Sequence, residues 1–467
     1  MSIKLFNTLS RKKEAFRPIR KGAVGMYTCG PTVYQYAHIG NMRAYVMADV
    51  LKRTLKYAGV KVNHVINITD VGHLTSDADE GEDKMEAEAR REQKSAQDIA
   101  QFYTTAFFDD LKILNIITKG IKFPRASKHI KEQIRLIKIL EKKGFAYQTS
   151  DGIYFDTSKF KNYGKLARLN LKGLREGARI GIHVEKKNVS DFALWKFSPK
   201  ESVRQQEWKS PWGVGFPGWH IECSAMSMKY LGKHFDIHTS GIDHIPVHHT
   251  NEIAQSESVT GKKFVNYWIH NEFVSMEGEK MAKSLGNIFT LADLGKKGVS
   301  PATYRYWLLT AHYRSPIAFS LEAVHGAGVA LLRIISTIAG APGGGRPVKR
   351  IMKKFTEYIS NDLDTPRAVA LIWEVLKDEK ISPQDKRATI FEFDNVLGLD
   401  MKGLVKNTKK IARVIVPENI EQLLREREDA RNKKDWATAD KLRGAIHALG
   451  YEIKDTNKGP EVVKIFS

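Results

Sequence analysis

Val24-Gly25-Met26-Tyr27-Thr28-Cys29 is the stretch that decides the fold, because it is a short β-prone run that Gly30-Pro31 brings to an end. An amphipathic stretch follows from about residue 43 to residue 58 and stops at Gly59, which is the pattern of a helix. Residues 62–70 are a second apolar run with strand character. A strand, a helix and a strand in this order form the unit that builds parallel sheets. The sequence therefore predicts a parallel α/β sheet.

The parallel pattern is interrupted and then resumes. Residues 145–155 contain two short apolar runs around a Ser-Asp-Gly turn, as in a β-hairpin, and a stretch rich in Lys and Gly follows to about Arg204. The earlier pattern returns with residues 218–231, a strand at 235–238 and a helix at 248–260. We therefore expect one sheet that is interrupted by an insert of mixed α and β structure.

The remainder of the chain is predicted to be helical. From about Pro301 helical patterns continue to the end, with a loop at residues 341–347 and a heavily charged pattern at residues 420–449. The expected divisions are the first half of the sheet domain at 1–118, an insertion at 119–210, the second half of the sheet domain at 211–270, the stem of a polar loop at 271–305, a helical bundle at 306–415 and a small helical domain at 416–467.

Length and composition restrict the class of protein. A chain of 467 residues and 52.9 kDa is too long for one core and suggests roughly three or four domains. No stretch approaches the roughly 20 uninterrupted apolar residues that span a bilayer, and the first residues do not resemble a secretory signal. With only two cysteines there is no disulfide framework. We expect a cytoplasmic protein without a membrane segment.

The charge of the chain favours a polyanionic partner. Lys and Arg outnumber Asp and Glu by 75 to 53, which gives a formal net charge of +22. Basic clusters occur at residues 346–354 and 406–413. Clustered basic side chains attract phosphates by releasing condensed counterions, which favours a nucleic acid. The alternative is a solvated basic surface that maintains solubility.

The two cysteines, Cys29 and Cys223, each lie beside residues that suggest chemistry. Farther along, His248 and Glu252 are four residues apart and therefore face the same way on a helix. Two thiolates, one imidazole and one carboxylate form a plausible zinc shell. The alternative is that both cysteines are inert buried side chains, as most free cysteines are, and their wide separation in sequence leaves this open.

Ala37-His38-Ile39-Gly40-Asn41 lies after the first strand and just before a helix. Backbone N–H groups and the helix dipole favour phosphate at such a position. His38 and Asn41 would contact phosphate oxygens, and Gly40 would let a flat base approach the backbone. The alternative is an ordinary helix start with an incidental histidine.

Lys280-Met281-Ala282-Lys283-Ser284 lies in a polar loop at residues 275–287. Two lysines three residues apart are suited to close over a triphosphate and to neutralise charge that develops during its displacement. Alone, the segment is also compatible with a basic surface loop. The two motifs are much more specific together, because they occur in this order on either side of an interrupted α/β sheet.

On these residues the chain resembles the class I aminoacyl-tRNA synthetases, whose paired signatures are His-Ile-Gly-His and Lys-Met-Ser-Lys-Ser. Within that class it is similar to the cysteinyl-tRNA synthetase family over nearly its whole length. The segments that carry the resemblance are residues 5–9, 27–34, 67–70, 191–196, 218–223, 236–238, 248–256 and 312–316. The resemblance implies an α/β fold: a Rossmann-like parallel-sheet catalytic domain with an inserted α+β segment, followed by an all-helical C-terminal domain on the side of the tRNA anticodon.

The resemblance also implies the activity, the cofactors and the site residues. It implies that cysteine is activated with Mg²⁺-bound ATP and then transferred to the terminal ribose of tRNA(Cys), at the 2′-hydroxyl, by a monomer that holds one zinc ion. The implied zinc ligands are Cys29, Cys223, His248 and Glu252; the residues around the amino acid are Gly30, Thr69, Trp219 and His238; and those that act on ATP are His38, Gly40, Asn41, Lys280 and Lys283.

Three positions depart from the family pattern. Asn41 replaces the last His of the first signature, and Ala282 replaces the middle Ser of the second, which keeps both lysines. Thr250 stands where a Glu is common, so Glu252 is the remaining candidate carboxylate ligand. We expect activity to persist, with the dynamics of the Ala282 loop as the property most open to change.

Zinc suits an enzyme that must distinguish cysteine from serine. A steric pocket alone discriminates small groups by only about 1–3 kcal/mol. Zinc deprotonates a coordinating thiol, whereas a serine hydroxyl is too basic to respond comparably. Because four protein ligands usually close a site, we expect five-coordinate zinc or a loosened Glu252 when substrate binds.

Two alternative functions remain open from the sequence. One is a related enzyme that joins cysteine to an amino sugar by the same chemistry, which the basic helical region after Asp364-Thr365-Pro366 disfavours. The other is an inactive RNA-binding relative, which the presence of both lysines and all four candidate ligands disfavours.

Overall fold

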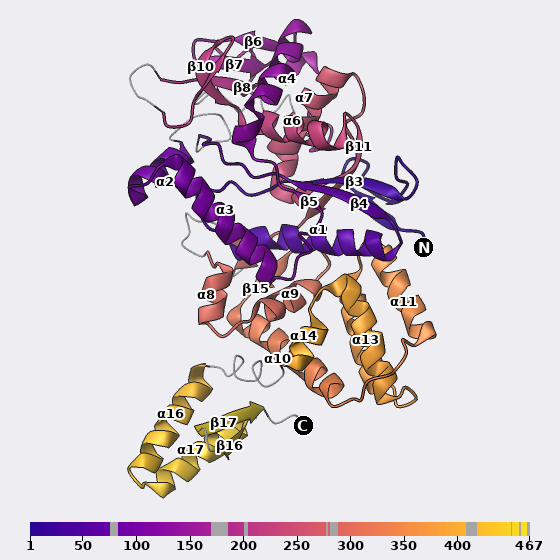
Figure 1. Cartoon of the computed structure of the whole chain (residues 1–467), viewed down its shortest axis with the longest axis vertical. Helices are drawn as coiled ribbons and strands as arrows, with labels where there is room; N and C mark the ends of the chain where they lie inside the picture. Colours follow the sequence, from indigo (N-terminus) through magenta and orange to yellow (C-terminus); the bar gives the residue numbers. More distant parts are fainter. Residues whose placement is uncertain are drawn as a thin grey trace.

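A five-stranded parallel sheet lies in the middle of the elongated molecule (Figure 1). The computed structural model describes residues 1–74, 83–169, 185–199, 204–276, 279–280, 288–407, 418–449, 451–456 and 459–464. The strands of the central sheet, in spatial order, are β12 (Val265–Asn271), β11 (Phe235–Gly241), β3 (Ala23–Thr28), β4 (Lys61–Ile66) and β5 (Ile121–Lys122). The predicted parallel α/β sheet is therefore confirmed.

Two helices cover the opposite faces of this sheet. Helix α1 (Ile39–Tyr57) packs against β4, β11 and β12, and α6 (Trp219–Leu231) packs against β3 and β4 from the other side (Figure 1). The chain leaves β3 towards β4 but leaves β11 towards β12, so the strand order reverses between β3 and β11. In open parallel sheets such a reversal opens a crevice at the carboxyl ends of the strands, where ligands bind.

The insert forms a separate sheet of five antiparallel strands at one end of the molecule (Figure 1). Its spatial order is β6 (Ala146–Gln148), β7 (Gly152–Phe155), β8 (Phe192–Phe197), β10 (Gly213–Pro217) and β9 (Trp208–Ser210). The pairing of β6 with β7 confirms the hairpin predicted at residues 145–155. Helix α4 (Ile130–Lys142) packs against α6 and α7 (Thr250–Thr260), and this contact joins the insert to the central domain.

Two helices and two small sheets flank the central sheet. Helices α2 (Lys84–Glu92) and α3 (Ala96–Ile113) follow β4. A two-stranded sheet joins β1 (Lys4–Asn7) to β2 (Lys12–Ala15), and a three-stranded one contains β14 (Glu279–Lys280), β13 (Val274–Met276) and β15 (Ile317–Phe319).

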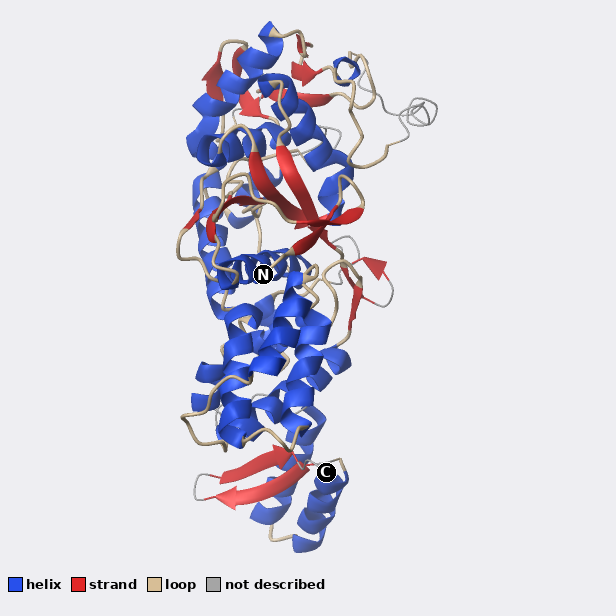
Figure 2. Ribbon diagram, turned by 90° about the vertical axis from the view of Figure 1, so that its right-hand side faces the viewer, coloured by secondary structure: helices blue, strands red, loops and turns tan. Residues whose placement is uncertain are grey.

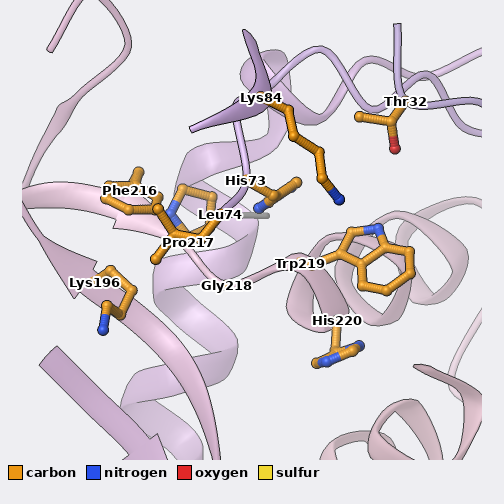
Figure 3. Close-up of a pocket in the computed structure, with 10 residues that line it drawn as sticks. All are labelled: Thr32, His73, Leu74, Lys84, Lys196, Phe216, Pro217, Gly218, Trp219 and His220. Carbon is orange, nitrogen blue, oxygen red and sulfur yellow. The ribbon is translucent and has the colours of Figure 1, made fainter. Parts of the chain in front are cut away.

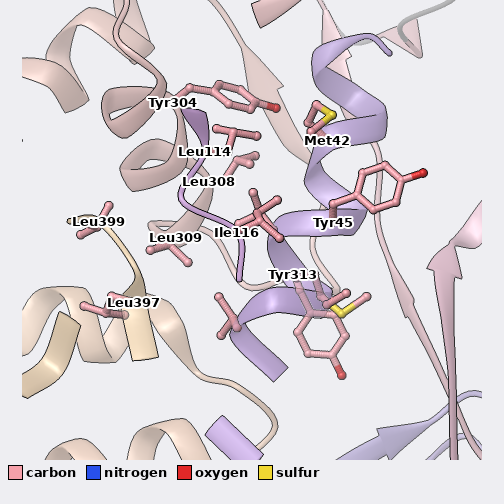
Figure 4. Packing of buried hydrophobic residues seen from close by; sticks show 14 of the residues in the cluster. Met42, Tyr45, Leu114, Ile116, Tyr304, Leu308, Leu309, Tyr313, Leu397 and Leu399 are labelled. Atoms are coloured by element: carbon pink, nitrogen blue, oxygen red, sulfur yellow. The ribbon is translucent and has the colours of Figure 1, made fainter. Parts of the chain in front are cut away.

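A helical region packs directly beneath the sheet domain (Figure 1). Its members are α8 (Leu291–Lys296), α9 (Pro301–Leu309), α10 (Leu321–Ala339), α11 (Lys349–Ser360), α12 (Thr365–Lys377), α13 (Pro383–Leu397) and α14 (Met401–Lys406). In Figure 4, Tyr304, Leu308 and Leu309 of α9 lie on the side of α1 that carries Met42, and all four belong to one cluster of buried residues. One apolar core therefore continues from the sheet domain into the helices.

Helix α10 is the one described helix that is long and apolar enough to cross a membrane by length and composition. The core helix of a globular protein passes the same test. Helix α10 packs against α9, α12, α13 and α14.

The prediction that the C-terminal part is all helical is wrong at its end. Helices α16 (Glu418–Asn432) and α17 (Trp436–Ala448) pack on each other, but β16 (Tyr451–Thr456) and β17 (Gly459–Lys464) follow as an antiparallel hairpin (Figure 2). The reason is that the spacing of the apolar residues changes from that of a helix to that of a strand. Tyr451 and Ile453 alternate with polar residues, and both are buried beside Ile420 and Ile446.

Candidate active site

The four candidate metal ligands converge in the folded chain. Cys29 follows β3, Cys223 lies in α6, and Glu252 lies in the first turn of α7. His248 lies in a short π-helical turn, residues 245–249, that leads into α7. All four are buried, and their ligand atoms lie within 4.8 Å of one another. This spacing, with two sulfurs, one imidazole and one carboxylate, fits the donor set that zinc prefers.

The orientation of His248 and Glu252 supports an ion between them and the cysteines. His248 Nε2 lies 3.1 Å from Glu252 Oε1. That oxygen is fully buried, yet it accepts no well-aligned hydrogen bond among the described residues. The other ring nitrogen of His248, Nδ1, lies 3.0 Å from Nδ1 of His220. A buried carboxylate oxygen without a donor is costly unless it ligates a cation, and His220 orients the imidazole as outer residues do at metal sites.

The electrostatics of the cluster favour its charged forms. A hydrogen bond from the Cys29 thiol lowers the pKa of Cys223 to about 6, while burial raises the pKa of Cys29. Burial by itself would lower the pKa of His248, but Cys223 and Glu252 raise it to about 10. Burial would likewise raise the pKa of Glu252, but His238 and His248 lower it to about 2. Two buried anionic donors therefore face one point, and thiolate and carboxylate are the states that ligate metals. A metal ion bound there would displace the proton of His248, because imidazole ligates in its neutral form.

A second group of donors overlaps the first. Cys29, His238, His249 and Glu252 also have ligand atoms within 4.8 Å of one another. His238 Nε2 lies 3.1 Å from Glu252 Oε2, and His249 Nε2 lies 3.2 Å from Cys29 Sγ. With one sulfur instead of two, this group is less suited to zinc. We assign His238 and His249 to the surroundings that orient the two ligands they contact.

Sequence reasoning missed His249 and the residue behind it. His249 Nδ1 lies 2.8 Å from His270 Nε2, and His270 Nδ1 lies 2.8 Å from the Thr8 hydroxyl. The only signal for His249 in the sequence is its position next to His248. His270 lies in β12, which is separate in sequence from the His248–His249 turn, so no local pattern identifies it.

The residues predicted around the amino acid occupy different positions. Trp219 packs against His248, with ring centroids 4.2 Å apart and the ring planes tilted by 39°, and lines a cavity of about 360 Å³, here called the main cavity. Gly30 also lines this cavity. Thr69 and His238 are buried and are not among the described residues of its wall. The prediction that these two contact the amino acid directly therefore remains a prediction.

Thr69 belongs to a buried hydrogen-bond chain that the sequence did not reveal. The Gly30 N–H donates to Asn67 Oδ1 at 2.8 Å, and the Asn67 amide donates to the Thr69 hydroxyl at 3.0 Å. Thr69 donates to Glu222 Oε2 at 3.1 Å, and His73 Nε2 lies 2.8 Å from Glu222 Oε1. Because Glu222 precedes Cys223, this chain holds the loop after β3 in register with the helix that carries the second cysteine.

The main cavity connects the metal cluster to the start of α1. It has a volume of about 360 Å³, and its wall includes Cys29 and Trp219 together with His38, Gly40 and Asn41. The wall is formed where β3 and β11 end, at the reversal of strand order. The first signature and the metal cluster therefore open onto the same space.

His38 and Asn41 together cap α1. The Asn41 N–H donates to His38 Nδ1 at 3.3 Å, and the His38 N–H donates to Asn41 Oδ1 at 3.1 Å. This reciprocal arrangement is a capping box, a role normally filled by Ser or Thr with Glu or Gln. A Cβ on Gly40 would lie 2.9 Å from the His38 ring, so glycine lets the ring fold back. The role of this motif in capping α1 is therefore compatible with its predicted contact with phosphate.

The second signature lies mostly outside the described residues. The backbone of Lys280 is in β14, paired with Ser275 of β13. The Lys280 side chain, Ala282 and Lys283 are not among the described parts of the structure. Their predicted action on ATP remains a prediction.

Replacing Gly30 by alanine is expected to reduce activity by about a hundredfold, because displacement of a site by about 1 Å costs that much. The added Cβ would lie 1.5 Å from the Asn67 carbonyl oxygen, so the backbone beside Cys29 must move. The effect is measured in the reaction that the family resemblance implies, the cysteine-dependent exchange of pyrophosphate into ATP. Gly343→Ala is the control, since no atom lies within 4 Å of the added Cβ. Equal activity of the two variants would show that the close contact is unimportant.

Comparisons with known proteins identify the family of the chain. Residues 15–328 match the family model of the tRNA synthetases class I (C) catalytic domain, and residues 415–462 match that of the cysteinyl-tRNA ligase anticodon binding domain. A cysteine–tRNA ligase 1 of Burkholderia lata is 50% identical over 460 residues, which cover 98% of this chain and 96% of that protein. A cysteine–tRNA ligase of Treponema denticola is 44% identical over 483 residues, covering 97% and 98%.

Solved structures show the same fold at low identity. A methionyl-tRNA synthetase of Mycobacterium tuberculosis, in complex with methionyl-adenylate, has a TM-score of 0.54 and 15% identity, covering 84% of this chain and 93% of that one. A LeuRS of Agrobacterium radiobacter, in a ternary complex with tRNA and LeuAMS, has a TM-score of 0.57 and 12% identity, covering 86% of each chain. The full-length identity to the curated relatives and the two family models show that the chain belongs to the cysteine–tRNA ligase family of class I tRNA synthetases.

Proposed function

We propose that this chain activates cysteine with ATP, forming cysteinyl-adenylate, and transfers the cysteinyl group to the 3′-terminal ribose of tRNA(Cys), with zinc selecting the substrate thiol. The observation that carries the proposal is the convergence of Cys29, Cys223, His248 and Glu252 beside a cavity that also contains the start of α1. Family membership supports the reaction, and the donor set supports the metal.

Zinc fits the cluster by its chemistry: two sulfurs, one imidazole and one carboxylate in a buried position. A zinc ion held there would bind the cysteine thiol as a thiolate and would discriminate against the serine hydroxyl, which does not ionise comparably. His220, His238 and His249 keep the ligands His248, Glu252 and Cys29 in orientation through the contacts described above. Trp219 covers His248 on the side of the cavity and restricts where the substrate can lie.

The side chains around the cavity position the two reactants for in-line displacement. The cysteine carboxylate oxygen attacks the α-phosphorus of Mg²⁺-bound ATP; a new C–O–P linkage forms, the bond to the β-phosphate oxygen breaks, and pyrophosphate leaves. The capped start of α1, with His38, Gly40 and Asn41, offers its positive end to the phosphates. Lys280 and Lys283 neutralise the charge that develops on them. Catalysis is by position and charge, without a covalent enzyme intermediate.

Transfer to tRNA follows as the second reaction. The 2′-hydroxyl of the terminal ribose attacks the carbonyl carbon of the adenylate, and AMP leaves. The net charge of +22 and the helical region favour an RNA partner, and residues 415–462 match an anticodon-binding model. We further propose a monomer that acts in the cytoplasm. The amino-sugar ligase and the inactive relative receive no support from the curated relatives.

The proposed function is tested by metal analysis combined with cysteine-dependent exchange of pyrophosphate into ATP. We expect about one zinc per chain, exchange with cysteine but not with serine, and charging of tRNA(Cys). Zinc-edge absorption should show one more sulfur ligand when cysteine is added. Exchange that does not depend on cysteine, or unchanged sulfur counts, would contradict direct selection by zinc.

A further inference from the structure

Lys84 is a cation at the cavity that no motif explains. It is the first residue of α2, and the preceding Asp83 caps the helix by accepting from the N–H groups of Met85 and Glu86. The Lys84 N–H donates to the His73 carbonyl oxygen at 3.1 Å, which fixes the backbone. Figure 3 shows the Lys84 side chain extending from this position towards the space between His73 and Trp219.

Two cavities meet at Lys84. It lines the main cavity of about 360 Å³ and a smaller one of about 80 Å³, and only Thr32 and Trp219 do so as well. Trp219 packs against the candidate ligand His248, with ring centroids 4.2 Å apart. His38 and Asn41 line the main cavity alone. Lys84 is therefore associated with the part of the cavity beside the metal cluster.

The charges of the cavity wall make Lys84 distinctive. Among the described residues that line the main cavity it is the only Lys or Arg, whereas Asp243 and Glu272 are acidic. None of the ion pairs found within the described ranges uses its ammonium group. An anion that enters the main cavity therefore meets the ammonium group of Lys84 on the described part of the wall. A charge-assisted hydrogen bond to this group is about twice as strong as a neutral one.

We propose that Lys84 binds the carboxylate of the amino acid while the thiol of the same molecule lies at the Cys29–Cys223–His248–Glu252 cluster. The proposal rests on the proposed function and adds a second point of recognition to it. The thiol end identifies the side chain, and the ammonium of Lys84 identifies the carboxylate and turns its oxygen towards ATP. Thiols that lack a carboxylate, such as cysteamine, lose this contact, so Lys84 selects amino acids over the corresponding amines.

The test compares cysteine with cysteamine in the wild-type chain, Lys84→Met and Lys84→Arg. In Lys84→Met we expect the KM for cysteine in pyrophosphate exchange, and its Kd by calorimetry, to rise about 10–100-fold. The KM for ATP and the inhibition constant of cysteamine should stay within about twofold, because neither depends on the carboxylate contact. Lys84→Arg keeps the charge and should recover most of the loss. Arg91→Met, on the exposed side of the same helix, is the matched control.

The other outcomes would contradict either the role of Lys84 or the proposed function. Equal weakening of cysteine and cysteamine would show that Lys84 only supports the structure of the pocket, and a change confined to ATP would assign it to a phosphate. Wild-type constants in Lys84→Met, in an enzyme that exchanges pyrophosphate with cysteine, would contradict this proposal alone. Absence of cysteine-dependent exchange in the wild-type chain would instead contradict the proposed function.

Discussion

Cys223→Ser is expected to abolish cysteine activation, with exchange activity falling by more than about a thousandfold, while the fold is retained. Loss of an outer contact at a metal site typically costs about 10–100-fold, and loss of a ligand costs more. The Cys223 thiol has a pKa lowered to about 6 and is buried, so it is prepared to ligate as a thiolate. A serine hydroxyl of nearly the same size stays protonated. The measurements are zinc content and pyrophosphate exchange.

The control for this variant is Ser227→Ala in the same helix. Ser227 is buried, but among the described residues its hydroxyl bonds only to the Ser224 carbonyl oxygen of its own helix. This substitution should keep both zinc and activity, and circular dichroism should show both variants folded. Normal activation by Cys223→Ser would show that the sulfur has no role in selecting the substrate.

Asp49→Ala is expected to lower the free energy of unfolding by about 3–5 kcal/mol, which is the usual cost of breaking a buried ion pair. Asp49 Oδ2 accepts from Arg53 at 2.7 Å and from Arg305 at 2.6 Å, and Oδ1 accepts from the Ile117 N–H at 3.0 Å. Arg305 also donates to the carbonyl oxygens of Leu114 and Leu397. Without the carboxylate, the guanidinium groups of Arg53 and Arg305 would remain buried without this anionic partner where α1, α9 and the end of α13 meet. The midpoint of urea unfolding measures the effect.

The contribution of Asp49 should depend on pH in a defined direction. Burial by itself would raise the pKa of Asp49, but Arg305 and Arg53 hold it below the usual value. A carboxyl group with a depressed pKa in the folded state stabilises fully above its unfolded pKa, and this stability is lost as pH falls through the folded pKa. The difference between wild type and Asp49→Ala should therefore be constant near neutral pH and shrink only in acid.

An exposed ion pair is the control for the Asp49 prediction. Lys354 lies 3.3 Å from Glu374, and half of each side chain is exposed. Lys354→Met should shift the unfolding midpoint little, because surface ion pairs contribute at most about 1 kcal/mol. Equal midpoints for Asp49→Ala and Lys354→Met would contradict the role assigned to the buried network.

Much of the fold was predictable because its elements follow local patterns. The run at residues 24–29, the helix after it and the hairpin at 145–155 appear with the expected character, since their apolar residues repeat with the period of a strand or a helix. The final hairpin was missed: the helical pattern before it is long, and the switch to alternation occupies only a few residues, beginning at Tyr451.

The candidate site was predictable in its donors but not in its surroundings. Cys29, Cys223, His248 and Glu252 were selected as residue types that suit zinc and by the four-residue spacing of the last two. Their roles remain proposals, although their atoms meet. His248 and His249 are adjacent in one helical turn and therefore point in different directions, His248 towards Cys223 and His249 towards Cys29. That the two cysteines lie at these places depends on the tertiary structure.

The amino-acid sequence by itself determined most of the secondary structure, the class of the sheet and the chemistry of the donors, because these depend on side-chain type and on neighbours a few residues away. The tertiary structure decided which donors share one point, that Lys84 lies at the cavity beside Trp219, and that His38 and Asn41 cap α1 at the wall of the same cavity. The cap itself is local, but the donor cluster and the cavity join segments that are far apart in the chain. The order of the strands in the sheet, and not any local pattern, brings them together.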